Sequence, residues 1–256
     1  MVDLHSHILP GIDDGARDMD EAIAMLRVAA NDGIHTIVAT PHQGAATAEV
    51  ISIAVTRLNQ EASHVGIPVR IVAGTEARVS LDLARLVQEG TLPTLNGSPY
   101  LLVELPLASP WPPFLSQAIY QLQLVGIQPV LAHAERYTDV QRHPAILQDL
   151  ISRDVIVQVN AGSLTTDPRS ARGRAARHLI RTRLAHVIAS DAHDPTIRPP
   201  RLSEALAAVT NLAGSAYAKW MTETAEAIVQ GQPVTLPDPA SKPAPSLIQR
   251  LLNRDR

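Results

Sequence analysis

The chain contains no cysteine. This absence excludes disulfide bonds, zinc sites built from thiolates and every mechanism that uses a cysteine nucleophile. Aromatic residues make up only 3% of the 256 residues, and Phe114 is the sole phenylalanine. Aliphatic side chains must therefore form the core. Hydrophobic residues reach 45% against 18% charged residues, which is enough to build one large α/β domain or two small ones.

An excess of positive charge is also missing. The net charge is −3 and the pI is near 6.4, so no electrostatic feature favours a nucleic-acid partner. The first residues, from Met1 to His5, lack the basic and apolar regions of a secretory signal. No apolar run approaches the roughly 20 residues that span a bilayer. We therefore expect a cytoplasmic protein whose contact with a membrane is at most indirect.

The chain is rich in short aliphatic runs that alternate with longer amphipathic segments. This alternation is typical of buried parallel strands joined by helices, and it predicts an α/β fold. The seven predicted strands cover residues 2–4, 36–39, 69–73, 100–103, 129–132, 156–159 and 186–189. The clearest predicted helices cover residues 18–31, 46–64, 113–124 and 201–212. Glycines follow three of them, at Gly33, Gly66 and Gly126.

The domain organisation follows from the absence of any linker before residue 231. We predict one domain over residues 1–231, because no internal repeat or low-complexity stretch interrupts it. Five prolines occur from Pro233 to Pro245 inclusive, which predicts a linker, and residues 246–254 form a short basic amphipathic pattern. This predicted tail, residues 232–256, either packs on the domain, remains unstructured, or docks on a partner or membrane surface.

Ionisable side chains follow the predicted strands. In parallel α/β folds, ligands bind at the carboxyl ends of the strands. The side chains at those ends are His5 and His7, His42, Glu76, Glu104, His133, Asn160, and Asp191 with His193. Such groups are avoided at buried positions unless they are paired or bound to a metal. Their convergence on one end of the fold indicates a cation or a catalytic task.

The spacing of these residues favours a metal. His5 and His7 stand two apart on an extended segment, so both imidazoles point to one side, and Asp191 and His193 repeat that spacing. Imidazole with carboxylate suits Zn²⁺, Mn²⁺ or Fe²⁺ better than Ca²⁺ or Mg²⁺. Each ion needs about three protein ligands and an open position, so the set predicts two or three ions. We expect the other histidines at the surface: His35, His64, His143, His178 and His186.

The segment 3–15, which closes on Asp13-Asp14-Gly15, resembles the opening motif of the polymerase-and-histidinol-phosphatase (PHP) superfamily. Its closing triplet resembles the bacterial protein-tyrosine-phosphatase branch, which acts on the autokinases of capsule and exopolysaccharide synthesis. The other similar pieces follow in order to about residue 213: Ala39-Thr40-Pro41-His42, Gly74-Thr75-Glu76, Leu102-Val103-Glu104, Ala132-His133-Ala134-Glu135-Arg136-Tyr137, Gln158-Val159-Asn160-Ala161-Gly162-Ser163, Ala189-Ser190-Asp191-Ala192-His193 and Arg198-Pro199-Pro200. The resemblance therefore covers most of the chain.

The resemblance implies a distorted (β/α)7 barrel that carries three divalent metal ions, most often manganese, with iron or zinc also suitable. It assigns His5, His7, Glu104 and Asp191 to the first ion, Glu76, Glu104 and His133 to the second, and Asp14, His42 and His193 to the third. Arg136 and Arg198 correspond to the two arginines that hold the phosphate. Ala134 departs from the proline or isoleucine that relatives carry there, and Asp13 beside Asp14 leaves the ligand ambiguous by one residue.

Three functions compete at this point. The resemblance favours a phosphatase that acts on a phosphotyrosine-bearing protein, a tyrosine autokinase, with metal-activated water as the nucleophile because cysteine is absent. A PHP phosphatase for a small ester such as histidinol phosphate is the alternative. A non-catalytic module on the same scaffold is disfavoured, because such a module would lose members of the ligand set. Asp191 and His193 could also shuttle protons, and Asn160 could orient a loop or a ligand rather than bind a metal. The oligomeric state does not follow from the sequence.

Overall fold

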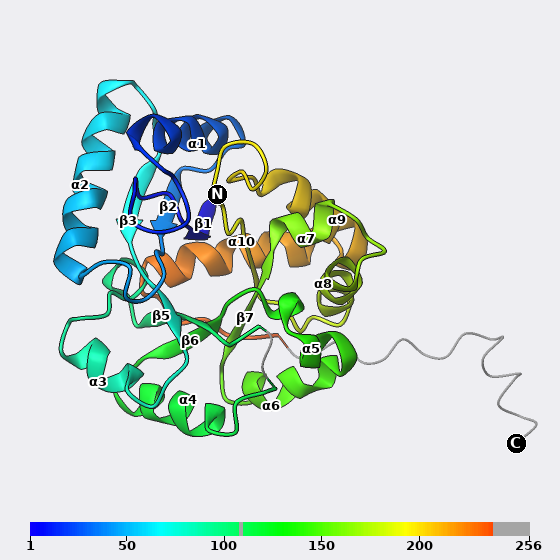
Figure 1. Ribbon diagram of the computed structural model, residues 1–256. Coiled ribbons are helices and arrows are strands. Elements are labelled where there is room, and N and C mark those ends of the chain that lie inside the picture. The colour runs from blue at the N-terminus through cyan, green and yellow to red at the C-terminus, as the bar shows by residue number, and fades with distance from the viewer. Residues whose placement is uncertain (108–109, 238–256) are drawn as a thin grey trace, which may run out of the picture.

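Strands and helices alternate along the chain as the sequence pattern predicts. The computed structural model describes residues 1–107 and 110–237, and Figure 1 shows their arrangement. The strands in these residues are β1 (Val2–Ser6), β2 (Thr36–Ala39), β3 (Arg70–Ala73), β4 (Glu76–Arg78), β5 (Tyr100–Glu104), β6 (Gln128–Leu131), β7 (Ile156–Asn160) and β8 (Val187–Ala189). All seven predicted strands are present. The prediction missed β4, because it is short and has charged residues at both ends instead of an aliphatic run.

Helices connect the strands. They are α1 (Met19–Asn31), α2 (Ala48–His64), α3 (Leu83–Gln88), α4 (Leu115–Leu124), α5 (Thr138–Arg142), α6 (Leu147–Ile151), α7 (Ala161–Thr165), α8 (Ala171–Arg181), α9 (Ser203–Ala213) and α10 (Ser215–Val229), with the 3-10 turns η1 (Leu95–Gly97), η2 (Ala134–Arg136) and η3 (Pro144–Ile146). The four predicted helices are confirmed to within two residues at either end. Side-chain oxygens of Asp18, Thr47 and Ser170 accept backbone hydrogen bonds at the starts of α1, α2 and α8, which explains where these helices begin.

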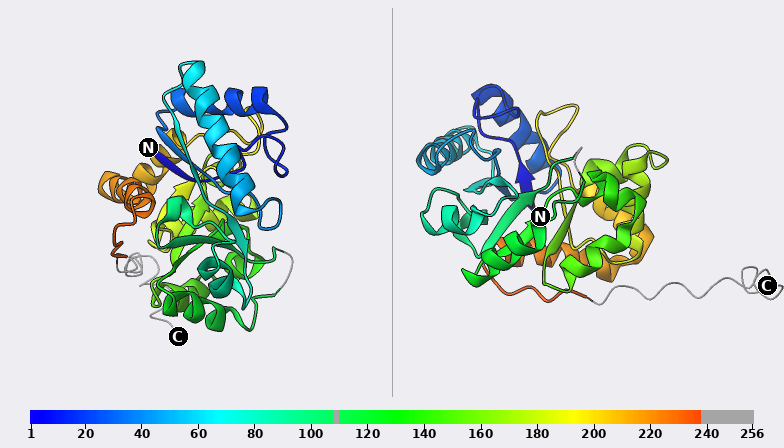
Figure 2. Two further views of the ribbon diagram at one scale, coloured as in Figure 1. Left: turned by 90° about the vertical axis from the view of Figure 1, so that its left-hand side faces the viewer. Right: turned by 60° about the horizontal axis from the view of Figure 1, so that its bottom comes forward.

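The strands form two sheets in which every pair is parallel. One sheet has the order β1-β2-β3 and the other the order β4-β5-β6-β7-β8. Isolated parallel bridges join Ser6 to Ala192 and His42 to Glu76, so the sheets also touch each other at two places. Helices surround the strands in Figures 1 and 2. The result is one mixed α/β domain in which the carboxyl ends of the strands point the same way.

The core has two layers because the strands are buried on both faces. Leu4, Val38, Leu102 and Val130 belong to an inner cluster, which α10 joins through residues such as Ile228. A larger outer cluster fills the space between the strands and the surrounding helices. Burial on both faces explains why the strands read as continuous aliphatic runs rather than alternating ones.

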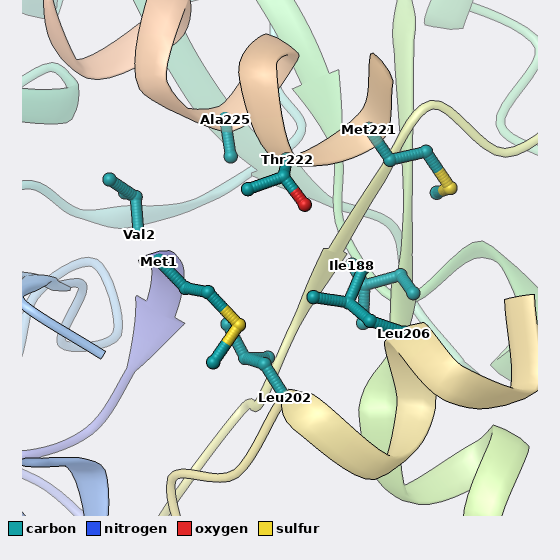
Figure 3. A pocket seen from close by; sticks show the side chains of 8 residues that line it. All are labelled: Met1, Val2, Ile188, Leu202, Leu206, Met221, Thr222 and Ala225. Carbon is teal, nitrogen blue, oxygen red and sulfur yellow. The ribbon is translucent and has the colours of Figure 1, made fainter. Parts of the chain in front are cut away.

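The amino-terminal end of the strands is closed. Figure 3 shows the small cavity there, where side chains of β1, β8, α9 and α10 meet. It is lined by Met1, Val2, Ile188, Leu202, Leu206, Met221, Thr222 and Ala225. Its volume of about 10 Å³ matches a single water molecule. This cavity is too small to hold a substrate.

The predicted linker begins against the domain. After α10, the Tyr100 hydroxyl donates a hydrogen bond to the carbonyl of Gln232 at 2.8 Å, and Leu236 packs on the core. The predicted helix over residues 246–254 lies outside the described residues. Among the helices that the structure describes, none has both the length and the apolar character that crossing a membrane requires.

One histidine that the sequence predicts at the surface is buried instead. His186 is fully buried, where its Nδ1 accepts a hydrogen bond from the Val157 amide at 3.0 Å and its ring meets the Trp220 ring edge to face. Burial lowers the pKa of His186 to about 3, so the ring is neutral. The surface prediction for His186 was wrong because the position of a residue at the start of a strand does not reveal whether a helix covers its side chain. His35, His64, His143 and His178 are exposed as predicted.

Asn59 of α2 occupies the free edge of β3. Its side chain donates to the Ile71 carbonyl at 2.8 Å and accepts from the Ile71 amide at 3.0 Å, as a neighbouring strand would. We expect Asn59→Ala to lower the free energy of unfolding by about 2–3 kcal/mol, because it leaves both backbone groups unpaired. Urea denaturation measures the change. The exposed neighbour Gln60→Ala is the matched control, and an equal effect of the two substitutions would contradict the prediction.

Candidate metal centre

The side chains predicted to bind metal gather at the carboxyl ends of the strands. His5 and Glu104 lie within β1 and β5, and Glu76 begins β4. The remaining members follow directly after their strands or lie in the loop after β1: His7, Asp14, His42, His133, Asp191 and His193. Most of them are nearly inaccessible to solvent. Asp14 is the outermost, with 63% of its side chain exposed.

Two histidines present lone pairs to the same point. His5 Nδ1 lies 3.3 Å from Gln158 Oε1, an oxygen that also accepts the His133 amide at 2.7 Å, so Nδ1 is the donor. His7 Nδ1 likewise donates to Asp13 at 2.7 Å. These hydrogen bonds leave the Nε2 atoms of His5 and His7 as lone pairs that face each other at 3.2 Å. They repel each other unless a proton or a metal ion lies between them.

The separation fits a shared metal ion. Two ligand atoms that each lie about 2.1 Å from one ion are about 3.0–3.4 Å apart. Asp191 Oδ1 lies 3.4 Å from His5 Nε2 and 3.5 Å from His7 Nε2. The two imidazoles and this carboxylate oxygen therefore form a compact ring of donor atoms.

Glu76 connects this ring to the next donors. Its Oε1 lies 3.4 Å from His5 Nε2 and 2.8 Å from His133 Nε2. Its Oε2 lies 3.5 Å from His7 Nε2 and 2.9 Å from His42 Nδ1. A carboxylate in contact with four imidazoles can bridge more than one ion. Glu104 lies beside it, with an oxygen 3.9 Å from His42 Nδ1, and forms a candidate group with His42 and Glu76.

A further candidate group lies closer to solvent. It consists of His7, Asp14, His42 and His193, whose donor atoms all lie within 4.8 Å of one another. Asp14 Oδ1 is 3.3 Å from His42 Nε2 and 3.5 Å from His193 Nε2. Asp13, in contrast, is turned inward to hold the ring of His7 and the amide of His42. The geometry thus gives the two neighbouring aspartates different roles.

Asp191 also gathers the two arginines. Its second oxygen accepts from Arg136 at 3.1 Å, from Arg198 at 2.7 Å and from Asn160 Nδ2 at 2.7 Å. The arginine side chains remain partly exposed, at 21% and 41%, so their other donors are open to a ligand. Asn160 thus orients Asp191, one of the roles the sequence allows for it.

The backbone is strained where the site is formed. His133 (φ 32°) and Asp191 (φ 53°) adopt the left-handed conformation directly after β6 and β8. Such conformations cost roughly 1–3 kcal/mol each in residues other than glycine. The turn at His133 starts η2, which carries Arg136. These two strained residues therefore position the candidate ligands His133 and Asp191, and with them Arg136, around the same site.

The buried carboxylates of the site favour bound cations. Burial opposes ionisation, yet the surrounding imidazoles and Arg198 hold the pKa values of Glu76 and Asp191 well below their usual range. Burial also opposes protonation of His5, but Glu76 and Asp191 raise its pKa to about 9. Protons and divalent cations therefore compete for these donors. The donors are imidazole nitrogens and carboxylate oxygens, a set that fits Mn²⁺, Fe²⁺ or Zn²⁺.

Sequence reasoning missed the residues that hold these groups in place. Gln158 orients His5 and His133, and Asp3 accepts hydrogen bonds from the amide and hydroxyl of Ser190. Glu135 accepts the Ser163 hydroxyl at 2.6 Å. Burial raises the pKa of Asp3 to about 6 and that of Glu135 to about 7. The available signal was a polar residue inside an apolar run, as at Gln158 and Asp3.

Comparison with known proteins identifies the family of this chain. The family model described as capsular polysaccharide synthesis, CpsB/CapC, matches residues 1–230. The chain belongs to the CpsB/CapC family. The tyrosine-protein phosphatase YwqE of Bacillus subtilis is 34% identical over 91% of this chain and 93% of its own. The putative tyrosine-protein phosphatase CapC of Staphylococcus aureus is 32% identical over 80% of this chain and 81% of its own.

A solved structure has the same fold. It comes from work on YwqE of Bacillus subtilis and CpsB of Streptococcus pneumoniae, described as unique metal-dependent tyrosine phosphatases. The two chains superpose with a TM-score of 0.89 at 33% identity, over 94% of this chain and all of the other. The CpsB/CapC fold therefore extends through nearly the whole molecule.

Gly15 allows the loop with Asp13 and Asp14 to close over His7. A Cβ at Gly15 would lie 1.8 Å from the His7 carbonyl oxygen. We expect Gly15→Ala to displace this loop and to lower the metal content of the purified protein. Elemental analysis after dialysis measures the loss. The control is Gly162→Ala, in which the new Cβ meets nothing within 4 Å. We expect this substitution to leave the metal content unchanged. Equal metal content in both variants would contradict the prediction.

Proposed function

We propose that this chain is a metal-dependent protein-tyrosine phosphatase. The observation that supports it most is the placement of two partly exposed arginines on Asp191, a carboxylate whose other oxygen faces the His5 and His7 lone pairs. Cation-binding donors and phosphate-binding donors thus meet at one carboxylate. The curated relatives are named tyrosine-protein phosphatases, and the intact donor set argues against a non-catalytic module.

The proposed scaffold is a distorted (β/α)7 barrel over residues 1–231, with residues 232–256 as linker and short basic helix. The parallel bridges between the two sheets support closure. Only Gly74 and Thr75 separate β3 from β4, so the two count as one bent strand and give seven in all. A Cβ at Gly74 would lie 2.8 Å from Val38 Cγ1, which agrees with a tight bend there.

The proposed metal complement is three divalent ions, with Mn²⁺ as the first choice and iron or zinc as alternatives. The proposed ligands are His5, His7, Asp14, His42, Glu76, Glu104, His133, Asp191 and His193. The three groups of close donor atoms support this number. Bound ions would supply Lewis acidity and a water nucleophile active near neutral pH.

The remaining catalytic work falls to Arg136 and Arg198. Their forked donors would hold the nonbridging oxygens of the phosphate and neutralise the charge that develops there. Asp194 fixes the loop that carries Arg198, because its carboxylate accepts the amides of Thr196, Ile197 and Arg198. A phenolate, whose parent pKa is near 10, leaves with little help from an acid. Hydrolysis of phosphotyrosine therefore needs no strong general acid.

The proposed substrate is a phosphotyrosine-bearing protein, a tyrosine autokinase that controls capsule or exopolysaccharide synthesis. The family description, which names capsular polysaccharide synthesis, supports it. Ile197 stands beside Arg198 with 86% of its surface exposed, and such an apolar side chain suits a tyrosyl ring. A cytoplasmic location follows from this substrate, because protein kinases use cytoplasmic ATP. We expect this protein to bind no nucleic acid and to contact a membrane only indirectly.

A comparison of two substrates tests the function. We expect a phosphotyrosyl peptide to be hydrolysed with a higher kcat/KM than histidinol phosphate, because the phenolate is the better leaving group and Ile197 offers it a surface. Phosphate release from the purified, metal-loaded enzyme measures both rates. Faster turnover of histidinol phosphate would favour the small-ester alternative instead.

A further inference from the structure

The outward face of α8 is strongly basic. Residues 169–183 contain six of the 22 lysines and arginines of the chain and no aspartate or glutamate. Arg174, Arg177 and Arg181 are spaced by three and four residues, so they line one side of the helix. We call these three residues the α8 stripe. The opposite side of α8 is buried through Ala176 and Leu179.

No carboxylate neutralises the α8 stripe within the part of the chain that the structure describes. The arginine ion pairs found there involve other residues, such as Arg85, Arg136, Arg153 and Arg198. Arg174 and Arg177 contact only backbone carbonyls, those of Arg169 and Leu164. The stripe therefore keeps its full positive charge.

This arrangement destabilises the helix. Like charges three and four residues apart repel by about 0.2–0.5 kcal/mol per pair. The first turn has no acidic residue, and Arg172 and Arg174 stand in the half of the helix where the macrodipole disfavours positive charge. The Ser170 cap and the buried face of α8 stabilise the helix, but among the described residues no carboxylate pairs with the three arginines to offset this repulsion. An anionic partner would offset it.

The α8 stripe lies close to the site. α8 packs against η2, which carries Arg136, and against α7, and Figure 1 shows α8 next to α7 and α9. Arg177 contacts the Leu164 carbonyl of α7, and Ser163 of the same helix donates to Glu135 of η2. A polypeptide whose phosphotyrosine reaches Arg136 can therefore continue along α8.

We propose that the α8 stripe binds an acidic segment of the phosphoprotein substrate, adjacent to its phosphotyrosine. This inference rests on the proposed function. Guanidinium groups form directional, bidentate hydrogen bonds with carboxylates and phosphates. Charge complementarity at an exposed rim acts mainly on encounter and specificity, so the stripe selects among phosphoproteins and leaves the chemistry at the metal ions unaltered.

A membrane surface fits the α8 stripe less well. A helix that lies on a bilayer inserts an apolar face below its charged residues. The apolar face of α8, including Leu179 and Ile180, is fully buried in the domain. The large hydrophobic residues exposed on the described part of the chain belong to other segments: Val50, Ile53, Val65, Leu81, Phe114, Tyr120, Leu124 and Ile197.

Two matched peptides test the inference. They carry the same phosphotyrosine, flanked by glutamates in one and by glutamines in the other. We expect the metal-loaded enzyme to show a KM for the glutamate peptide about five- to tenfold lower at low salt, since exposed ion pairs contribute about 0.2–1 kcal/mol each. The ratio of the KM for the glutamine peptide to the KM for the glutamate peptide should fall to about 1 in the double variant Arg174→Gln/Arg181→Gln. The control Arg27→Gln/Arg57→Gln, with equal charge loss on exposed residues of α1 and α2, should keep it.

The outcomes separate the two claims. Because the ratio compares peptides within one enzyme, incomplete folding or metal loading of a variant does not change it. Equal KM values in the parent enzyme would overturn the α8 proposal and leave the phosphatase function intact. Failure to hydrolyse either peptide, with another ester hydrolysed, would overturn the proposed function itself. A retained ratio with lost binding of Arg174→Gln/Arg181→Gln to phosphatidylglycerol vesicles would assign the stripe to a membrane instead.

Discussion

The structure depends on one constraint, which is the meeting of imidazole lone pairs and carboxylate oxygens in a space that water barely reaches. His5 and His7 face each other across 3.2 Å, and Asp191 and Glu76 stand within 3.5 Å of both. Without a cation between them, such groups repel or take up protons, and burial makes either state costly. Gln158 and Asp13 hold the rings in this arrangement, and the strained turns after β6 and β8 serve the same end.

The parallel sheets bring these groups together. Most strands are buried on both faces and are held by aliphatic packing, which positions their carboxyl ends. The polar residues that come next have no freedom to turn away from one another. Leu4, Val38, Leu102 and Val130 of these strands pack together in the inner cluster. An almost purely aliphatic core is therefore sufficient, and the chain needs neither disulfides nor many aromatic residues to build a precise site.

Eight of the nine candidate ligands could be predicted from the sequence because each follows or ends a recognisable apolar run, whereas Asp14 came from the family resemblance alone. Among the strands, β4 could not be predicted because it has only three residues, and only its pairing with β5 reveals it. The residues that orient the ligands escaped prediction because their partners are remote in sequence: Gln158 lies 153 residues from His5. His186 escaped for the same reason, since α10 supplies the Trp220 ring that covers it. Local pattern identifies a polar residue in a strand, but only the fold identifies its partner.

Anomalous X-ray diffraction from crystals of protein purified without chelators locates bound metal ions directly. We expect anomalous peaks at metal absorption edges within the three donor groups, which are His5, His7 and Glu76, then His7, Asp14, His42 and His193, and finally His42, Glu76 and Glu104. We also expect Gln158 and Asp13 to hold the two histidine rings as they do here. An ordered site without peaks, in which His5 and His7 share a proton and hydrogen-bond directly to Glu76 and Asp191, would contradict this expectation.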